Sequence, residues 1–194
     1  MNIGLFFGSF NPIHVGHLII ANHMAENSDL DKVWFVVTPH NPHKKKNTLL
    51  SDHHRLQMVN IAVEEYPNLE VSNIEFDLPQ PSYTVNTLIH IGEKFPQHQF
   101  SLIMGEDNLK SFHKWKNYET ILENYQIYVY PRVANETAKS ELLAHKHIHQ
   151  ISAPIVELTS TSIRKGIAAE KNIRPLVPQN VWNYLDEMNF YKKQ

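Results

Sequence analysis

The sequence predicts a doubly wound α/β fold with a mostly parallel sheet. Short apolar runs alternate along the chain with helical segments, which is the pattern of strands connected by crossover helices. The 194 residues suit one domain, and a composition of 42% hydrophobic and 20% charged residues is ordinary for a globular chain with a core. No internal repeat or Gly/Ser linker divides the sequence, so residues 1–194 are expected to form a single domain.

The first segments of the chain show this alternation of predicted strands and helices. Ile3–Phe7 is apolar enough for a strand buried on both faces, and a helical pattern follows from Val15 to Glu26. Val and aromatic residues in Val33–Thr38 indicate a second buried strand. Prolines then favour a loop over Pro39–Asn47. Ser51 is a good N-cap for a helix that reaches Glu65.

The rest of the chain continues the same pattern. Ser82 is a candidate N-cap, and Pro178 suits the first turn of the last helix. The later strands are expected at Leu69–Ile74, Phe100–Met104, Gln126–Tyr130 and Ile148–Ile151. The later helices are expected at Tyr83–Glu93, Tyr118–Glu123, Thr161–Ala169 and Pro178–Met188. Ligands of such sheets bind beyond the carboxyl ends of the strands, so the loops that start at Gly8, Pro39 and Gly105 are expected to converge.

Charge and residue usage restrict the classes of function. A formal net charge of −2 gives no sign of bulk electrostatic binding to nucleic acid. The chain has no cysteine, which excludes disulfides, a thiolate nucleophile and cysteine-ligated metal sites. The N-terminus does not resemble a signal peptide, and no stretch is apolar enough for a membrane helix. We therefore expect a cytoplasmic protein with no nucleic-acid or membrane partner, and a homo-oligomer remains open.

The segment Gly8–His17 has the chemistry of a phosphate-binding turn. Small residues follow the first strand and let the backbone approach a ligand, and the N–H groups of the next helix point outward. His14 and His17 are about one helical turn apart, so both can donate to one phosphate group. The alternative is a pair of structural histidines or a weak metal site.

A second segment, Leu158–Arg164, places hydroxyl groups at the start of a helix. Such hydroxyls cap the helix and can bind anions, and Arg164 is one turn further on, where its guanidinium can reach phosphate oxygens. The alternative is an ordinary capped helix with a surface arginine.

Both segments resemble signatures of the nucleotidyltransferase superfamily, which also includes class I aminoacyl-tRNA synthetases. Gly8–His17 resembles G-x-F-x-P-x-H-x-G-H, and Leu158–Arg164 resembles I-S-S-T-x-x-R with Leu158 and Thr159 as departures. The resemblance implies a Rossmann-like fold and adenylyl transfer, with His14, His17 and Arg164 as catalytic residues. It implies that ATP contacts Gly8, Ser9, Phe10, His14, Gly16, His17, Thr159, Ser160, Thr161 and Arg164.

The nucleotide acceptor is suggested by other segments. Pro81–Thr84, Gly105–Leu109 and the Trp115 region resemble the bacterial nicotinate mononucleotide adenylyltransferases, and the likeness runs nearly end to end. It implies that nicotinate mononucleotide contacts Lys44, Tyr83, Thr84, Gly105, Asp107 and Trp115. From the residues alone, Tyr83 and Trp115 could equally be packing aromatics, and Lys44 could belong to a solvated loop.

Other assignments stay open. The acceptor could be nicotinamide mononucleotide or phosphopantetheine, or the chain could be a non-catalytic nucleotide- or RNA-binding module. Mg²⁺ is expected as the cofactor, held by substrate phosphates and water rather than by a protein cage. A metal face at His145, His147 and His149 is disfavoured, because histidine-rich surface segments are common. His54 and Arg55 at a helix start could shape the acceptor side.

Overall fold

A six-stranded sheet organises the chain. The computed structural model describes residues 1–39, 49–132 and 141–193. The strand order is β3-β2-β1-β4-β5-β6, and each neighbouring pair among these six runs parallel. The strands are β1 (Asn2–Gly8), β2 (Lys32–Val37), β3 (Leu69–Ser72), β4 (Gln99–Gly105), β5 (Ile127–Tyr130) and β6 (Ile148–Gln150).

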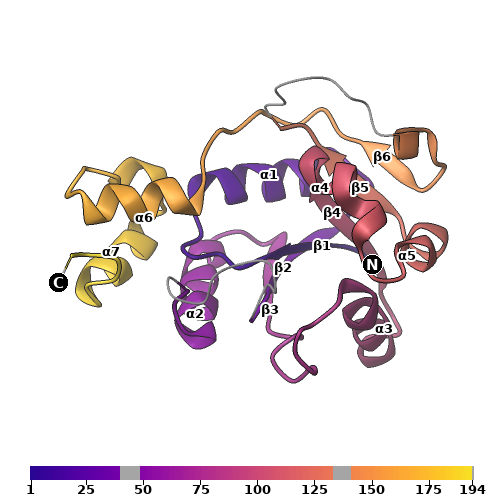
Figure 1. The fold of residues 1–194 in the computed structure, drawn as a ribbon, viewed down its shortest axis with the longest axis horizontal. Coiled ribbons are helices and arrows are strands. Elements are labelled where there is room, and N and C mark those ends of the chain that lie inside the picture. The colour runs from indigo at the N-terminus through magenta and orange to yellow at the C-terminus, as the bar shows by residue number, and fades with distance from the viewer. Residues whose placement is uncertain (40–48, 133–140, 194) are drawn as a thin grey trace.

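Helices connect the strands and close the C-terminal part of the chain. They are α1 (Val15–Glu26), α2 (Asp52–Val63), α3 (Thr84–Lys94), α4 (Glu106–Ser111), α5 (Tyr118–Asn124), α6 (Ser160–Ala168) and α7 (Gln179–Glu187). In Figure 1 the two last helices lie together at one end of the molecule, while α3 and α5 lie toward the other.

Two apolar cores lie on the two faces of the sheet, as expected when side chains alternate along buried strands. Phe6, Val33 and Phe35 face one core, where they pack with residues of α1, α2, α6 and α7. Leu5 and Trp34 face the other core, with residues of α3, α4 and α5. The predicted doubly wound, parallel α/β architecture is therefore confirmed.

The strand order reverses direction between β1 and β4. From β1 the chain winds outward through β2 to β3, then crosses back to β4 on the other side of β1 and continues to β5 and β6. At such a switch point the loops after two adjacent strands turn away from each other, which leaves a crevice beyond their carboxyl ends. The segments after Gly8 and Gly105 begin at this crevice.

Several local predictions need correction. Ser51 caps α2 as expected, with its Oγ accepting from the His54 amide. Ser82 does not cap α3: Tyr83 is the N-cap residue, and the Ser82 hydroxyl is buried beside the Glu75 carboxyl. The strand expected at Leu69–Ile74 ends at Ser72. Helix α4 was not predicted, because its six residues are too few to show a helical period.

Within the ranges that the structure describes, no helix is both long and apolar enough to cross a membrane.

Two adjacent residues of α3, one buried and one exposed, allow a test of the core that contains residues of α3, α4 and α5. Leu88 is 0% exposed and Ile89 is 49% exposed. We expect Leu88→Ala to lower the free energy of unfolding by about 2–5 kcal/mol, because it removes buried methyl groups and leaves a cavity. Ile89→Ala, on the same helix, should cost less than about 1 kcal/mol. Urea denaturation of both variants measures this, and equal losses would contradict the assignment of Leu88 to the core.

Candidate active site

A cleft of about 460 Å³ opens at the carboxyl ends of the strands around the switch point. It brings together segments that are far apart in the sequence: the turn after β1, the end of β5 and the start of α6. Its walls are formed by Phe6, Phe7, Gly8, Ser9, Phe10, Asn11, His14, His17, Leu49, Ile103, Asn108, Tyr130, Arg132, Leu158, Thr159, Ser160, Thr161 and Arg164. The structure therefore places nine of the ten predicted ATP-contacting residues in one cavity, all but Gly16.

The two predicted histidines form a stacked pair at the start of α1. Their ring centroids are 3.6 Å apart and their planes differ by 23°. The backbone N–H of His14 donates to Nδ1 of His17 at 3.2 Å. Because Nδ1 of His17 accepts a hydrogen bond, its neutral imidazole carries the proton on Nε2. Nε2–H is then the donor that His17 can offer to an anion.

His14 is held in its neutral form by its surroundings. It is 3% exposed, and burial lowers the pKa of its imidazole to about 4, with the charge of Arg132 acting in the same direction. A buried imidazole loses the hydration that stabilises its charged form, which explains the sign of the pKa shift. At neutral pH His14 is thus a dipolar hydrogen-bonding group rather than a cation.

Two glycines permit close packing around the histidines. A Cβ on Gly16 would lie 2.9 Å from Val156 and 3.1 Å from Nδ1 of His14. A Cβ on Gly8 would lie 2.7 Å from the ring of Phe10, which is itself in the left-handed region at φ 44°. Gly16 lines a smaller cavity of about 20 Å³ next to the cleft, together with His14, His17 and Arg132. Its part in the site is to let the histidine pair pack against Val156.

The second predicted segment is attached directly to the first. Arg164 donates from Nη1 to the Asn11 carbonyl at 2.7 Å and from Nη2 to the Thr161 hydroxyl at 3.2 Å. Ser160 donates its hydroxyl hydrogen to the Pro12 carbonyl at 2.8 Å. Thr159 caps α6 by accepting from the Ser162 amide at 3.1 Å. The side chains of this segment therefore fix α6 against the turn after β1, and the α6 N-terminus faces the cleft.

The five predicted acceptor residues that the structure describes lie outside the walls of this cleft. Tyr83 precedes α3, and Nζ of Lys116 lies 4.4 Å from the centre of its ring. Thr84 is the first residue of α3, and the Trp115 ring packs on Phe112 at a centroid distance of 5.4 Å. The structure thus brings the Tyr83 and Trp115 segments together through Lys116. Lys44 lies outside the described residues.

Asp107 links the acceptor side to the cleft. Its carboxylate lies 3.6 Å from Nη1 of Arg132, which lines the cleft. Gly105 allows this arrangement, because a Cβ there would lie 2.5 Å from Oδ1 of Asp107. An exposed ion pair of this length contributes little to stability. Its main effect is therefore to orient the Arg132 guanidinium.

The histidines of the β6 region contact neighbouring residues. His147 Nδ1 is 2.8 Å from the Leu122 carbonyl, and His149 Nε2 is 2.6 Å from Oε1 of Gln126. His149 also stacks on Tyr128. Outside the stretches 40–48 and 133–140, no group of three or more histidine or acidic side chains could hold a metal ion.

Comparison with known proteins identifies the family. The cytidylyltransferase-like family model matches residues 5–166. A protein of Flavobacterium psychrophilum, named a probable nicotinate-nucleotide adenylyltransferase, is 66% identical over 193 residues, with all of both chains covered. A protein of the same name from Cytophaga hutchinsonii is 52% identical, with 98% of each chain covered. The chain belongs to the nicotinate-nucleotide adenylyltransferase family.

Solved structures agree with this family at the level of the fold. The nicotinic acid mononucleotide adenylyltransferase of Plasmodium falciparum, complexed with NaAD, superimposes with a TM-score of 0.83 at 20% identity, covering 98% of this chain and 97% of that one. The fold predicted from the sequence is thus the fold of a solved adenylyltransferase.

Sequence reasoning missed several residues that line the cleft or contact its walls. Arg132 follows β5, so the rule that ligands bind beyond parallel strands could have found it. Asn11 lies within the recognised segment but was not singled out. Tyr191 donates its hydroxyl hydrogen to Oδ1 of Asn11 at 2.5 Å, across 180 positions of sequence, and no local signal indicated it. His54, which could shape the acceptor side, contacts the Tyr184 hydroxyl at 2.8 Å.

The neutrality of His14 can be tested by titration. Its pKa near 4 lies below the ordinary value of 6.5, so the unfolded chain takes up the proton first as the pH falls. Stability from this group is complete above pH 6.5 and should decline by about 2 kcal/mol between pH 7 and pH 5. In an NMR titration, the His14 ring signals, assigned by comparison with His14→Gln, should keep neutral-form shifts down to about pH 5. A midpoint near pH 6.5 would contradict this account.

Proposed function

We propose that this chain transfers the adenylyl group of ATP to nicotinate mononucleotide, giving nicotinate adenine dinucleotide and pyrophosphate, a step of NAD biosynthesis. Family membership supports the reaction, and one structural observation supports its location. The stacked His14–His17 pair and the α6 segment that carries Arg164 line the same cleft, at the switch point of a doubly wound sheet.

The reaction would proceed by direct displacement. An oxygen of the mononucleotide phosphate attacks the α-phosphorus of ATP, a new P–O bond forms, and the bond to the β-phosphate oxygen breaks as pyrophosphate leaves. No covalent enzyme intermediate is required. Catalysis therefore consists of positioning two substrates and stabilising charge on the triphosphate.

The residues around the cleft suit the triphosphate. His17 donates through Nε2–H, and neutral His14 adds a hydrogen-bonding ring beside it. Arg164 and Arg132 both line the cleft, where their guanidinium groups can balance phosphate charge. The N-termini of α1 and α6 direct backbone N–H groups toward the same space. The proposed ATP contacts are the ten residues given by the two signatures, with Arg132 added.

The proposed acceptor site lies beside this cleft. Tyr83 and Trp115 would flank the pyridine ring, because both are aromatic residues on neighbouring segments at the sheet's carboxyl edge. The N–H groups at Thr84 would contact the carboxylate of the nicotinate ring. Gly105 and Asp107 would contact a ribose, and Lys44 would approach the acceptor phosphate.

Enzymes of the nucleotidyltransferase family use a divalent metal together with ATP. The cleft walls offer imidazole, hydroxyl, carbonyl and guanidinium groups rather than clustered carboxylates. This donor set fits a metal that arrives on the triphosphate, and we propose Mg²⁺, which keeps much of its water and binds phosphate oxygens. When bound, it would neutralise charge that develops on the phosphates.

The proposal extends to the chain as a whole. We propose that residues 1–194 act as one unit, since helices α6 and α7 near the C-terminus pack into the same core as α1. A cytoplasmic location, where ATP is supplied, is the expected setting, and the partners are the two small-molecule substrates.

A pyrophosphate-release assay tests the function directly. With ATP and Mg²⁺, we expect release with nicotinate mononucleotide and much slower release with nicotinamide mononucleotide or phosphopantetheine. The expected preference comes from the Thr84 N–H groups, which would bind a carboxylate better than an amide. No release with any of the three acceptors would refute the proposed reaction, and faster release with either rival would reassign the acceptor.

His17→Ala tests the role of the stacked pair. We expect kcat to fall by more than about tenfold, as for the loss of one donor that stabilises developing charge. His23→Ala is the matched control, because His23 lies on the same helix but not in the cleft walls, and its activity should be near wild type. Steady-state kinetics of both variants provide the measurement. Near-normal turnover of His17→Ala would remove His17 from the mechanism.

A further inference from the structure

Arg55 is a charged side chain with no exposed surface. It lies in the first turn of α2 and is 0% exposed. Burying a charge is costly unless the group is paired and fully hydrogen-bonded, so an arginine in this position needs strong compensating contacts. Neither signature segment contains Arg55, and it does not line the cleft.

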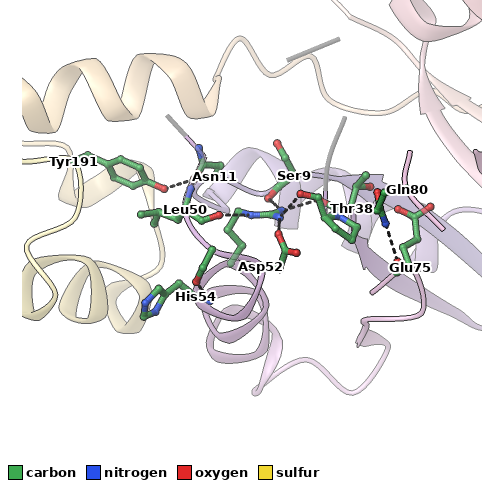
Figure 2. Close-up of polar contacts among 12 residues, drawn as sticks. Ser9, Asn11, Thr38, Leu50, Asp52, His54, Glu75, Gln80 and Tyr191 are labelled. Atoms are coloured by element: carbon green, nitrogen blue, oxygen red, sulfur yellow. Dashed lines mark hydrogen bonds and ion pairs between the residues drawn. The ribbon is translucent and has the colours of Figure 1, made fainter. Parts of the chain in front are cut away.

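Four of the hydrogen bonds of Arg55 go to backbone carbonyls. Nη1 donates to the carbonyl of Ser9 at 2.6 Å and to that of Thr38 at 2.9 Å. Nη2 donates to Pro39 at 3.1 Å, and Nε donates to Leu50 at 3.1 Å. The carboxylate of Asp52 pairs with Nη2 at 2.5 Å. In Figure 2 the Ser9, Thr38, Leu50 and Asp52 side chains surround a common point to which the dashed lines converge.

These carbonyls belong to different parts of the site. Ser9 is a wall residue of the cleft, immediately after β1. Thr38 and Pro39 follow β2, and Leu50 precedes α2. One planar guanidinium therefore joins the turn that lines the cleft to both ends of the stretch 40–48, which includes Lys44. Only arginine offers five N–H donors in a fixed plane, and a lysine ammonium could not reach all of these acceptors.

We propose that Arg55 is a positioning residue that fixes the ATP-binding turn relative to the acceptor-side segment after β2. The inference rests on the proposed function, because it concerns the relative placement of its two substrates. Arg55 does not touch either substrate. It acts through the Ser9 carbonyl on one side and the Thr38, Pro39 and Leu50 carbonyls on the other.

This role has a kinetic signature. A reaction between two bound substrates depends on their mutual distance, and a displacement of about 1 Å can reduce the rate by about 10²-fold. Each substrate alone still meets its own binding groups if the two segments shift as units. Loss of the guanidinium should therefore lower kcat while leaving the separate affinities for ATP and for nicotinate mononucleotide nearly unchanged.

Arg55→Lys is the variant of choice, because it retains the charge and most of the side-chain volume. We expect kcat to fall by more than about tenfold, while Kd for MgATP alone and for nicotinate mononucleotide alone, from calorimetry, changes less than about threefold. Met58→Ala is the matched control for stability: Met58 is also 0% exposed on α2, and it packs in the core. It should lower Tm and leave kcat within about twofold of wild type.

The outcomes separate the proposal from a purely structural role. The proposal is overturned if Arg55→Lys keeps kcat within threefold of wild type, or if Met58→Ala lowers kcat as much as Arg55→Lys does. It is also overturned if both Kd values of Arg55→Lys rise by as large a factor as kcat falls. If Arg55→Lys does not fold, Asp52→Ala takes its place, because Asp52 has a side chain that is 40% exposed and orients Nη2. A kcat loss of at least threefold there supports the role, and an unchanged kcat overturns it. Turnover of the wild-type protein tests the proposed reaction itself, independently of how the variants compare with wild type.

Discussion

The site depends on the hydrogen bonds that hold the turn after β1, and three of them meet at Asn11. Its carbonyl accepts from Arg164 of α6, and its Oδ1 accepts from the Leu50 amide at 3.2 Å. The same Oδ1 accepts from the Tyr191 hydroxyl at 2.5 Å (Figure 2). Three distant parts of the chain thus fix one short turn. The stacked histidines begin only three residues later, so their orientation is set by these contacts.

The electrostatics of the cleft follow from the same packing. Burial keeps His14 neutral, while guanidinium groups at Arg132 and Arg164 supply the positive charge. Hydrogen-bonding groups and positive charge are therefore provided by different residues around a single cavity.

Much of this could be predicted from the sequence, for physical reasons that are local. The strands and the turn after β1 are encoded by short apolar runs and by residues within ten positions of each other. Arg132 directly follows β5 and could have been found in this way, whereas Tyr191 could not, because its contact with Asn11 joins residues 180 positions apart. Ser82 misled the prediction because its hydroxyl turns toward Glu75 instead of the end of α3. The six acceptor residues remain predictions.

The contact between Tyr191 and Asn11 has a consequence for biosynthesis. The turn that carries the histidines is translated well before Arg164 and Tyr191, which lie 153 and 180 positions after Asn11 in the sequence. A nascent chain can pair β1 with β2 early and can form the contacts of the first turn with Leu50 and Arg55, yet the contacts with Arg164 and Tyr191 form only when the last helices have left the ribosome. Nucleotide binding should therefore arise only after the segments that carry Arg164 and Tyr191 have been made.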